Sequence, residues 1–345
     1  MRKIFIFISL ILGVGLFVFA LKSVDLSEVS QILSKIWPFK FLLILFSFFL
    51  AQIFVSTYRW FCILKTQGVS LKFYPLFLIK FVGFAFSYLT PVVFFGGEPV
   101  RYALLREETK APPKHIISSI MLDKIISFFI SVFYFLFGIF IFIVYFPTTF
   151  ITKILVIGLT ILATSLGFLI YLKLKDITLK KGILSYILKK LYLSNTKFFQ
   201  RRENSIKEIE TEIAEFFHRK PKDVLKIFLL GFFEIFLMIF SFWLVVIFLD
   251  KYLAFLKIFA INSMIALAGT IPLPAALGSL EVSQSFIFDF FGLTRETGIA
   301  FSLIFRGINL LFAFIGLSLF SYLQLRIFKK KILWFCKKIA KLYEK

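Results

Sequence analysis

Long apolar stretches, separated by short polar and basic segments, run from the first residues of the chain to about residue 326. Several exceed the roughly 18 apolar residues that an α-helix needs to cross a bilayer. The pattern predicts an all-α polytopic membrane protein, because a soluble domain cannot bury this much apolar surface. The apolar segments are 4–21, 39–60, 73–95, 116–146, 151–172, 224–249, 253–271, 280–292 and 297–326.

The composition agrees with this pattern and changes how the high net positive charge is interpreted. The 345 residues are 60% hydrophobic, with a mean hydropathy of +0.93 and a net charge of +22. Such a charge suggests nucleic acid in a soluble protein, but here Lys and Arg cluster between apolar segments. The positive-inside rule accounts for that distribution, so no nucleic-acid partner is expected. The connector 173–223 holds 13 Lys and Arg, and the tail from Arg326 holds eight.

Basic residues also constrain the topology. The N-terminal "MRK", the loop 98–115, the connector 173–223 and the tail 327–345 are all expected to be cytoplasmic. Nine full crossings would place the two termini on opposite sides. The constraints are met if 73–98 and 253–292 are re-entrant hairpins, from the cytoplasm and the outside respectively. Six full spans then remain, at 4–21, 39–60, 116–146, 151–172, 224–249 and 297–326. The first is interpreted as an uncleaved helix rather than a signal peptide.

Two basic segments have amphipathic patterns. In the connector, apolar residues recur at helical spacing among Glu and Lys, and the tail 327–345 is a basic amphipathic stretch. We expect both to pack on the membrane surface rather than to bind a protein partner. The apolar positions in the connector are Ile206, Ile209, Ile213, Phe216 and Phe217.

The two hairpins share a register that suggests an internal repeat. "LTPVVFFGGEPVR" (89–101) and "PLPAALGSLEVSQ" (272–284) each place a proline seven residues before a glutamate. The same offset of 183 residues relates repeat 1 (39–146) to repeat 2 (224–326), whose matched spans are predicted to run in opposite directions. Chance agreement in a chain with 52 Phe is the alternative. Pairs at this offset are Pro91 and Pro274, Glu98 and Glu281, Trp60 and Trp243, and Asp123 and Arg306.

Ionisable residues inside the apolar segments are the candidate site. Each costs roughly 2.5–3.5 kcal/mol at the bilayer centre, so it persists when paired or when it lines a polar cavity. Lys80, Lys124 and Asp289 have the alternative of an interfacial position, and Glu234 is a further candidate. The predicted lining residues are Glu98, Arg101, Asp123, Lys124, Glu281 and Arg306, and the predicted hairpin turns are Pro91, Gly96, Gly97, Pro272, Pro274 and Gly278.

These residue types favour an anionic ligand. Arginine forks match phosphate oxygens, and nearby carboxylates can hold the cations while the site is empty. The carboxylates Glu98, Asp123 and Glu281 can alternatively act as general acid and base, which leaves a membrane-embedded enzyme open. No nucleotide loop, zinc signature or Ser/His/Asp set is present, and two histidines and two cysteines give no metal spacing. No cofactor is expected.

The motifs "GGEPVRYALLRE" (96–107), "MLDKIISFF" (121–129), "PLPAALGSLEVSQ" (272–284) and "FSLIFRGINLLF" (301–312) resemble the lysylphosphatidylglycerol synthase transmembrane-region, or flippase-like, family. The resemblance covers nearly the whole chain. It implies one transmembrane domain over 1–345 in the plasma (inner) membrane, acting on phospholipids or polyprenyl-linked lipids. Ala275 and Ala276 stand where the family usually has glycines, and Lys124 where it usually has arginine.

The resemblance also bears on catalysis. Family members that make aminoacylated lipid carry a soluble catalytic domain, which this sequence lacks, so aminoacyl transfer is not expected. We expect a protein that flips an anionic lipid between leaflets. The alternatives are an enzyme that transfers a group to or from a lipid-linked phosphate, and a membrane partner of a separately encoded lipid-modifying enzyme.

Overall fold

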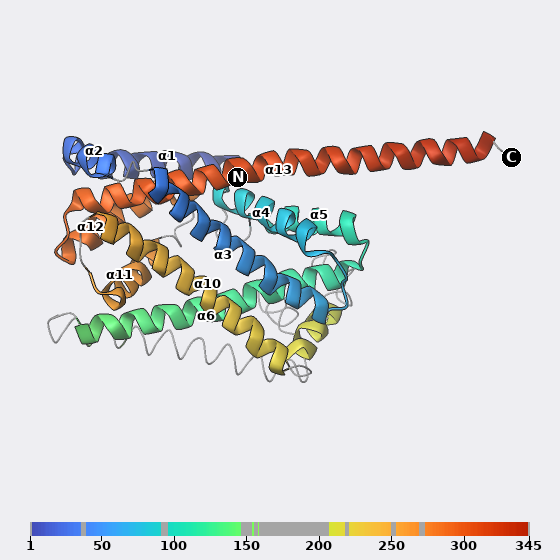
Figure 1. Ribbon diagram of the computed structural model, residues 1–345, viewed down its shortest axis with the longest axis horizontal. Helices are drawn as coiled ribbons and strands as arrows, with labels where there is room; N and C mark the ends of the chain where they lie inside the picture. The colour runs from blue at the N-terminus through green and yellow to red at the C-terminus, as the bar shows by residue number, and fades with distance from the viewer. Residues whose placement is uncertain are drawn as a thin grey trace.

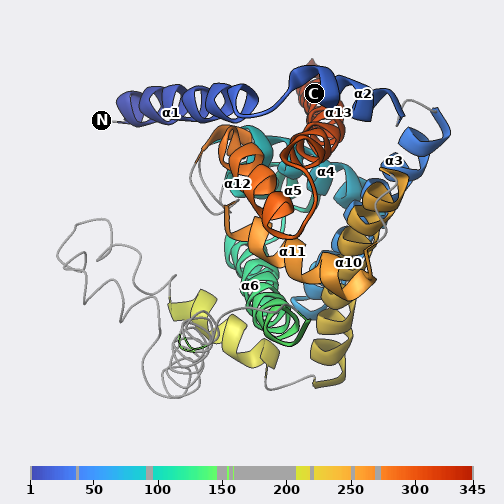
Figure 2. The ribbon, with the colours of Figure 1, turned by 90° about the vertical axis from the view of Figure 1, so that its left-hand side faces the viewer.

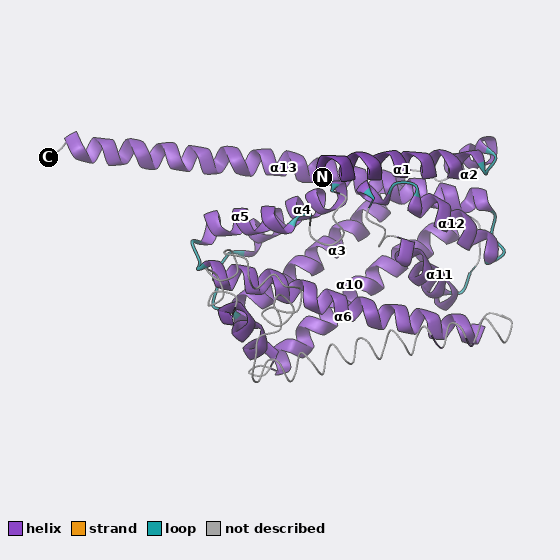
Figure 3. Cartoon of the chain, turned by 180° about the vertical axis from the view of Figure 1, so that it is seen from behind, coloured by secondary structure: helices purple, strands orange, loops and turns teal. Residues whose placement is uncertain are grey.

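The computed structural model describes residues 2–35, 39–90, 96–145, 154, 158, 207–217, 221–249, 253–268 and 273–343. Within these ranges every regular element is a helix, and short loops join neighbouring helices (Figure 3). The all-α prediction is therefore confirmed for the described chain. The elements are α1 (Arg2–Lys22), α2 (Leu26–Lys35), α3 (Phe39–Thr66), α4 (Phe73–Leu89), α5 (Glu98–Thr109), α6 (Pro113–Tyr145), a helix over 207–217, α10 (Pro221–Phe248), α11 (Phe255–Ala268), the 3-10 turn η2 (Pro274–Ala276), α12 (Ser279–Phe290) and α13 (Arg295–Tyr343).

Four described helices are long and apolar enough to cross a membrane, namely α3, α6, α10 and the first part of α13. They coincide with four of the six predicted spans. The predicted span 4–21 lies within α1, which meets the test together with α2 across a bend of 88°. The span 151–172 lies outside the described residues apart from 154 and 158. Six full spans therefore remain a prediction.

The outer faces of these helices carry large apolar side chains. Phe140 on α6, Leu229 on α10 and Phe314 on α13 are 60%, 58% and 69% exposed in the isolated chain. In water such surfaces would drive aggregation, whereas in a bilayer they contact lipid tails at no cost. A bilayer offers no water to the backbone, so these long apolar sequences form helices, in which the backbone hydrogen bonds are satisfied internally.

The four long helices are related two by two by opposite directions, α3 to α10 and α6 to α13 (Figure 1). α3 and α10 pack against each other and run in opposite directions across the molecule (Figure 1). α6 and α13 also run in opposite directions, and α13 continues well beyond the other helices. The shorter helices pack on long helices that are distant in sequence. α4, which lies between α3 and α6 in the chain, packs on α13, whereas α11, which lies between α10 and α13, packs on α6.

The segment α4–α5 is a tight hairpin. The Gly97 N–H donates to the Ser87 Oγ over 3.0 Å, which brings the start of α5 back against the last turns of α4. A Cβ on Gly97 would lie 2.0 Å from the carbonyl oxygen of Gly83, so the reversal requires glycine at position 97. The predicted turn residues Gly96 and Gly97 therefore lie at the fold-back, while Pro91 lies outside the described residues.

The segment α11–η2–α12 is the second short-helix unit. Pro274 opens η2, and Gly278 (φ 79°) precedes α12, whereas Pro272 lies outside the described residues. A Cβ on Gly278 would lie 2.4–2.7 Å from atoms of Gly13, Leu16 and Phe17 in α1. This turn is thus packed under α1, whose N-terminal end extends away from the other helices (Figure 2).

The connector helix 207–217 packs differently from our expectation. Its residue Phe216 is 5% exposed and belongs to the apolar core beneath α3, α5 and α6, while Ile213 and Phe217 pack partly against that core. The helix is amphipathic as predicted, but its apolar face contacts the protein rather than remaining free for the membrane surface. Glu212 fastens it further, with its Oε2 2.8 Å from the His115 Nδ1. Ile206 lies outside the described residues.

Candidate functional site

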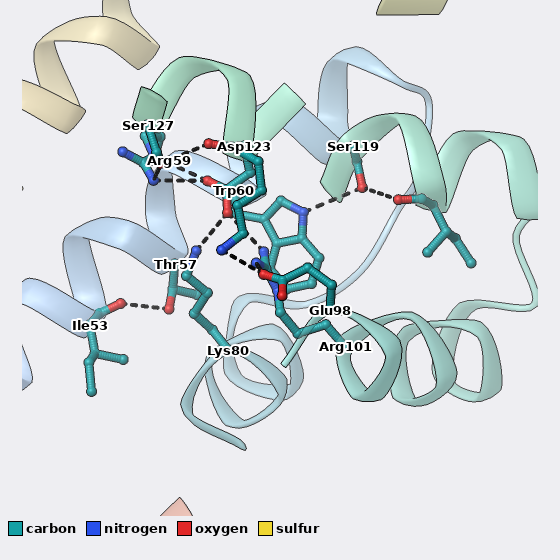
Figure 4. Close-up of polar contacts among 12 residues, drawn as sticks. Ile53, Thr57, Arg59, Trp60, Lys80, Glu98, Arg101, Ser119, Asp123 and Ser127 are labelled. Carbon is teal, nitrogen blue, oxygen red and sulfur yellow. Dashed lines mark hydrogen bonds and ion pairs between the residues drawn. The ribbon is translucent and has the colours of Figure 1, made fainter. Parts of the chain in front are cut away.

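The carboxylate of Asp123, on α6, lies at the centre of a buried group of cations. Its Oδ1 accepts from the Arg59 Nε at 3.2 Å and the Arg59 Nη2 at 3.0 Å. Its Oδ2 accepts from the Lys80 Nζ at 2.8 Å and the Arg101 Nη2 at 2.9 Å. The Asp123 side chain is 2% exposed, and the three cations reach it from α3, α4 and α5 (Figure 4).

Two further carboxylates flank this centre. Glu98 Oε1 lies 2.7 Å from the Lys124 Nζ and 3.5 Å from the Arg101 Nη1. On the other side, Glu234 Oε2 on α10 lies 3.1 Å from the Arg59 Nη1. We call these residues the Asp123 cluster: four cations and three carboxylates, with an excess of one positive charge. Its members are Arg59, Lys80, Glu98, Arg101, Asp123, Lys124 and Glu234.

An aromatic wall closes one side of the Asp123 cluster. The Arg101 guanidinium lies 3.9 Å from the centre of the Trp60 ring, and the Lys80 Nζ lies 5.7 Å from it. Trp60 is fully buried, and its indole N–H donates to the Ser119 Oγ over 3.4 Å. The ring contributes a cation–π attraction and excludes water, which strengthens the ion pairs beside it.

The hairpin α4–α5 explains how two of these charges reach the centre. Glu98 opens α5, where the helix dipole favours a carboxylate, and Arg101 follows one turn later on the same face. Arg101 then crosses α4 at Gly83, where a Cβ would lie 2.6 Å from the arginine Cγ. The glycine therefore makes room for the arginine to approach Asp123.

A second buried pair lies at the start of α12. Glu281 is 0% exposed, and its Oε1 accepts from the Arg306 Nε at 2.6 Å and the Ser302 Oγ at 3.0 Å. Its Oε2 accepts from the Gly278 N–H at 2.8 Å, which caps the helix. We call this the Glu281–Arg306 pair. Arg306 also donates from Nη1 to the Ala275 carbonyl oxygen over 3.4 Å.

The turn that presents this carbonyl is strained. Ala275 and Ala276 have φ values of 52° and 48°, in the left-handed region where a Cβ costs about 1–2 kcal/mol per residue. Alanine is more constrained than glycine in this region, so these two residues make the turn stiffer than glycines would. The strain is balanced by contacts of the turn, including the Arg306 hydrogen bond.

The structure divides the predicted site residues into two groups. Glu98, Arg101, Asp123 and Lys124 belong to the Asp123 cluster, whereas Glu281 and Arg306 form the separate pair. Across the described chain no hydrogen bond or ion pair joins the two groups. α4 connects them spatially, because Lys80 belongs to the first group and the same helix packs against α13 and η2, which carry Arg306 and Ala275 of the second.

Sequence reasoning missed Arg59 and underrated Lys80. Arg59 is 4% exposed and was not among the candidate residues, although it lies inside the apolar segment 39–60. Lys80, for which the sequence leaves an interfacial position open, has a side chain that is 14% exposed and bound to Asp123. The sequence feature that could have identified Arg59 as a site residue is its position directly before Trp60, one of the residues that set the repeat register. Asp289 is different, because it pairs with Arg295 on an exposed surface.

The sequence relationships agree with this architecture. The family model described as "Lysylphosphatidylglycerol synthase TM region" matches residues 6–316. The chain belongs to this family. The residues of both buried groups fall inside the matched region, and the family match together with the apolar helices makes the protein a multi-pass membrane protein.

The chain is 24% identical over 293 residues to a curated relative, a UPF0104 membrane protein of Methanocaldococcus jannaschii. The match covers 82% of this chain and 84% of that protein. No solved structure matches the sequence. Within the described residues, no group of three His, Cys, Asp or Glu side chains is arranged to hold a metal ion.

Proposed function

We propose that this protein translocates an anionic phospholipid or polyprenyl-linked lipid across the plasma membrane, through a polar site built around the Asp123 cluster. The observation that carries the proposal is the excess of cations in that cluster, buried among membrane-spanning helices. Each charge is expensive at membrane depth, and such residues persist there mainly where they bind or conduct a polar solute.

Phosphate is the ligand chemistry that best matches this set. Arg101 presents a guanidinium whose Nε is buried and has no hydrogen-bond partner among the described residues. A phosphate oxygen could accept from that nitrogen while Lys80 and Lys124 supply further positive charge. Asp123 and Glu98 pair with these cations, so a lipid phosphate would exchange with the two carboxylates rather than meet unpaired charges.

Matching element positions support an inverted-topology repeat. α3 and α10 begin at residues 39 and 221, and α4 and α11 at 73 and 255, in both cases 182 residues apart. α5 and α12 begin at 98 and 279, and both contain 12 residues. The opposite directions of α3 and α10, and of α6 and α13, are those that an inverted repeat requires (Figure 1).

Helix lengths favour re-entrant hairpins for the shorter elements. α4 and α11 contain 17 and 14 residues, or about 25 and 21 Å, and the 12 residues of α5 or α12 extend about 18 Å. Each falls short of the roughly 30 Å hydrocarbon core. Broken helices at such hairpins commonly line the substrate site of a transporter. The basic residues of the termini and of the connector 173–223 support a cytoplasmic location for these segments.

The test is lipid movement by purified protein in liposomes. A labelled phosphatidylglycerol or polyprenyl phosphate should change leaflet with the natural protein. Transport should fall by at least tenfold in Arg101→Gln, since each charged hydrogen bond to phosphate contributes about 1.5–3 kcal/mol. Arg295→Gln is the matched control, because Arg295 forms an exposed ion pair away from both buried groups and should transport normally.

Other outcomes would assign a different role. Conversion of a lipid-linked phosphate to a new product, without movement between leaflets, would replace transport with the enzyme interpretation. If the protein neither moves nor converts lipid, but a separately encoded lipid-modifying enzyme becomes active only in its presence, the accessory role would replace both.

A further inference from the structure

The seam between α3 and α10 contains an apolar recess that faces the lipid. Ala51, Phe54 and Val55 of α3 and Phe233 and Leu237 of α10 line a hollow of about 360 Å³. Phe54 and Phe233 are 52% and 49% exposed, so the hollow opens to the membrane rather than to the protein core. Its size and lining suit an aliphatic chain.

A second recess, cationic and partly polar, lies on the same seam nearer the ends of the helices. Lys65 of α3 and Lys226 of α10 line it together with Tyr58 and the carboxylate of Asp223. Lys226 donates to the Tyr58 hydroxyl over 3.2 Å, whereas neither lysine forms an ion pair with any described carboxylate. Two cations against one carboxylate leave this recess with one excess positive charge.

The distance between the two recesses is comparable to the length of a phospholipid from its head group along its tails. Ala51 in the apolar recess and Cys62 in the cationic recess are 11 residues apart on α3, or about 16 Å. That is close to half of the roughly 30 Å hydrocarbon core, which is the length of one leaflet's tails. The 26-residue span Phe41–Thr66 extends about 39 Å, so its last turns, with Lys65, reach the head-group region.

We infer that the α3–α10 seam binds an anionic phospholipid, with its phosphate at Lys65 and Lys226 and a tail in the apolar recess. A soluble anion would use the lysines but leave the aligned apolar recess empty, and a neutral lipid would leave the cations uncompensated. The site is distinct from the Asp123 cluster, because none of its lining residues belongs to that cluster. By the predicted orientation it belongs to the cytoplasmic leaflet.

The test measures phosphatidylglycerol retained by the detergent-purified full-length protein, by native mass spectrometry during titration. Each lysine near a head group contributes about 1 kcal/mol, so Lys65→Gln/Lys226→Gln should weaken binding by about 30-fold. The matched control, Lys72→Gln/Lys222→Gln, removes the same charge from exposed lysines near the same helix ends but outside the recess. It should change binding by less than about threefold.

A second pair of variants tests the tail. Ala51→Trp should fill the apolar recess and weaken phosphatidylglycerol binding by about tenfold, because the excluded tail loses buried apolar area. Leu229→Trp adds the same ring to an exposed position outside the recess and should leave binding unchanged. In Cys336→Ser protein, phosphatidylglycerol should also protect the Cys62 thiol from a maleimide, and Lys65→Gln/Lys226→Gln should abolish that protection.

Three results would overturn the inference. Equal weakening by the two double lysine variants would indicate diffuse attraction to the basic surface. Equal retention of phosphatidylcholine and phosphatidylglycerol would show that charge is not recognised. Normal binding by Ala51→Trp would exclude the tail from the recess. None of these measurements requires transport, so a failure of this inference can be distinguished from a failure of the proposed function.

Discussion

Breaking the Glu281–Arg306 pair on one side should destabilise the protein more than replacing both residues. Glu281 is 0% exposed, and in Arg306→Gln its carboxylate would keep only the Ser302 hydroxyl and the Gly278 N–H. Leaving one member of a buried ion pair uncompensated costs about 3–5 kcal/mol. Glu281→Gln/Arg306→Gln removes both charges, so we expect a coupling free energy of about 2–3 kcal/mol.

Reversible unfolding in mixed micelles, with SDS as denaturant, measures this coupling through the two single variants and the double variant. The matched control is the Asp289–Arg295 pair, whose side chains lie 2.8 Å apart but are 46% and 42% exposed. An exposed pair contributes about 0–1 kcal/mol, so its own cycle should show little coupling. Both pairs join α12 to the first turns of α13, which keeps the comparison local.

Additivity in the Glu281–Arg306 cycle would refute the reasoning. If the double variant is as destabilised as the sum of the two single variants, the two side chains do not depend on each other. Coupling of equal size in the exposed control pair would also count against burial as the cause.

Two further predictions concern local geometry, and a third concerns the predicted topology. Gly83→Ala should reduce lipid transport, because the added Cβ would displace the Arg101 side chain where it crosses α4. Gly307→Ala, whose Cβ would meet nothing within 4 Å, should transport normally. Ala275→Gly should raise unfolding free energy by about 1 kcal/mol, because φ is 52° there; a loss of stability would show that the turn carries no strain. Cysteines placed at Asp250 and Thr294 should both react with an impermeant reagent added to intact cells, and access at only one would exclude the outward hairpin.

The amino-acid sequence by itself determined the elements and the kind of chemistry. Hydrophobic runs longer than a bilayer's thickness are local signals, so α3, α6, α10 and α13 were predictable, as was their helical form. Glycines within apolar sequence marked the fold-back before α5 and the turn before α12. Charges in apolar segments identified Asp123 and Glu281, because an isolated charge at that depth is too costly to occur without a partner.

Only the tertiary structure decided which charges meet. Arg59 and Asp123 are 64 residues apart, and their contact depends on how α3 packs beside α6, which no local pattern specifies. Packing likewise brought Lys80 into the Asp123 cluster and kept Glu281 and Arg306 outside it. It also turned the apolar face of the connector helix toward the protein, through Phe216. Amphipathic periodicity shows that a face must be covered, but lipid and protein cover it equally well, so only the arrangement of neighbouring helices selects between them.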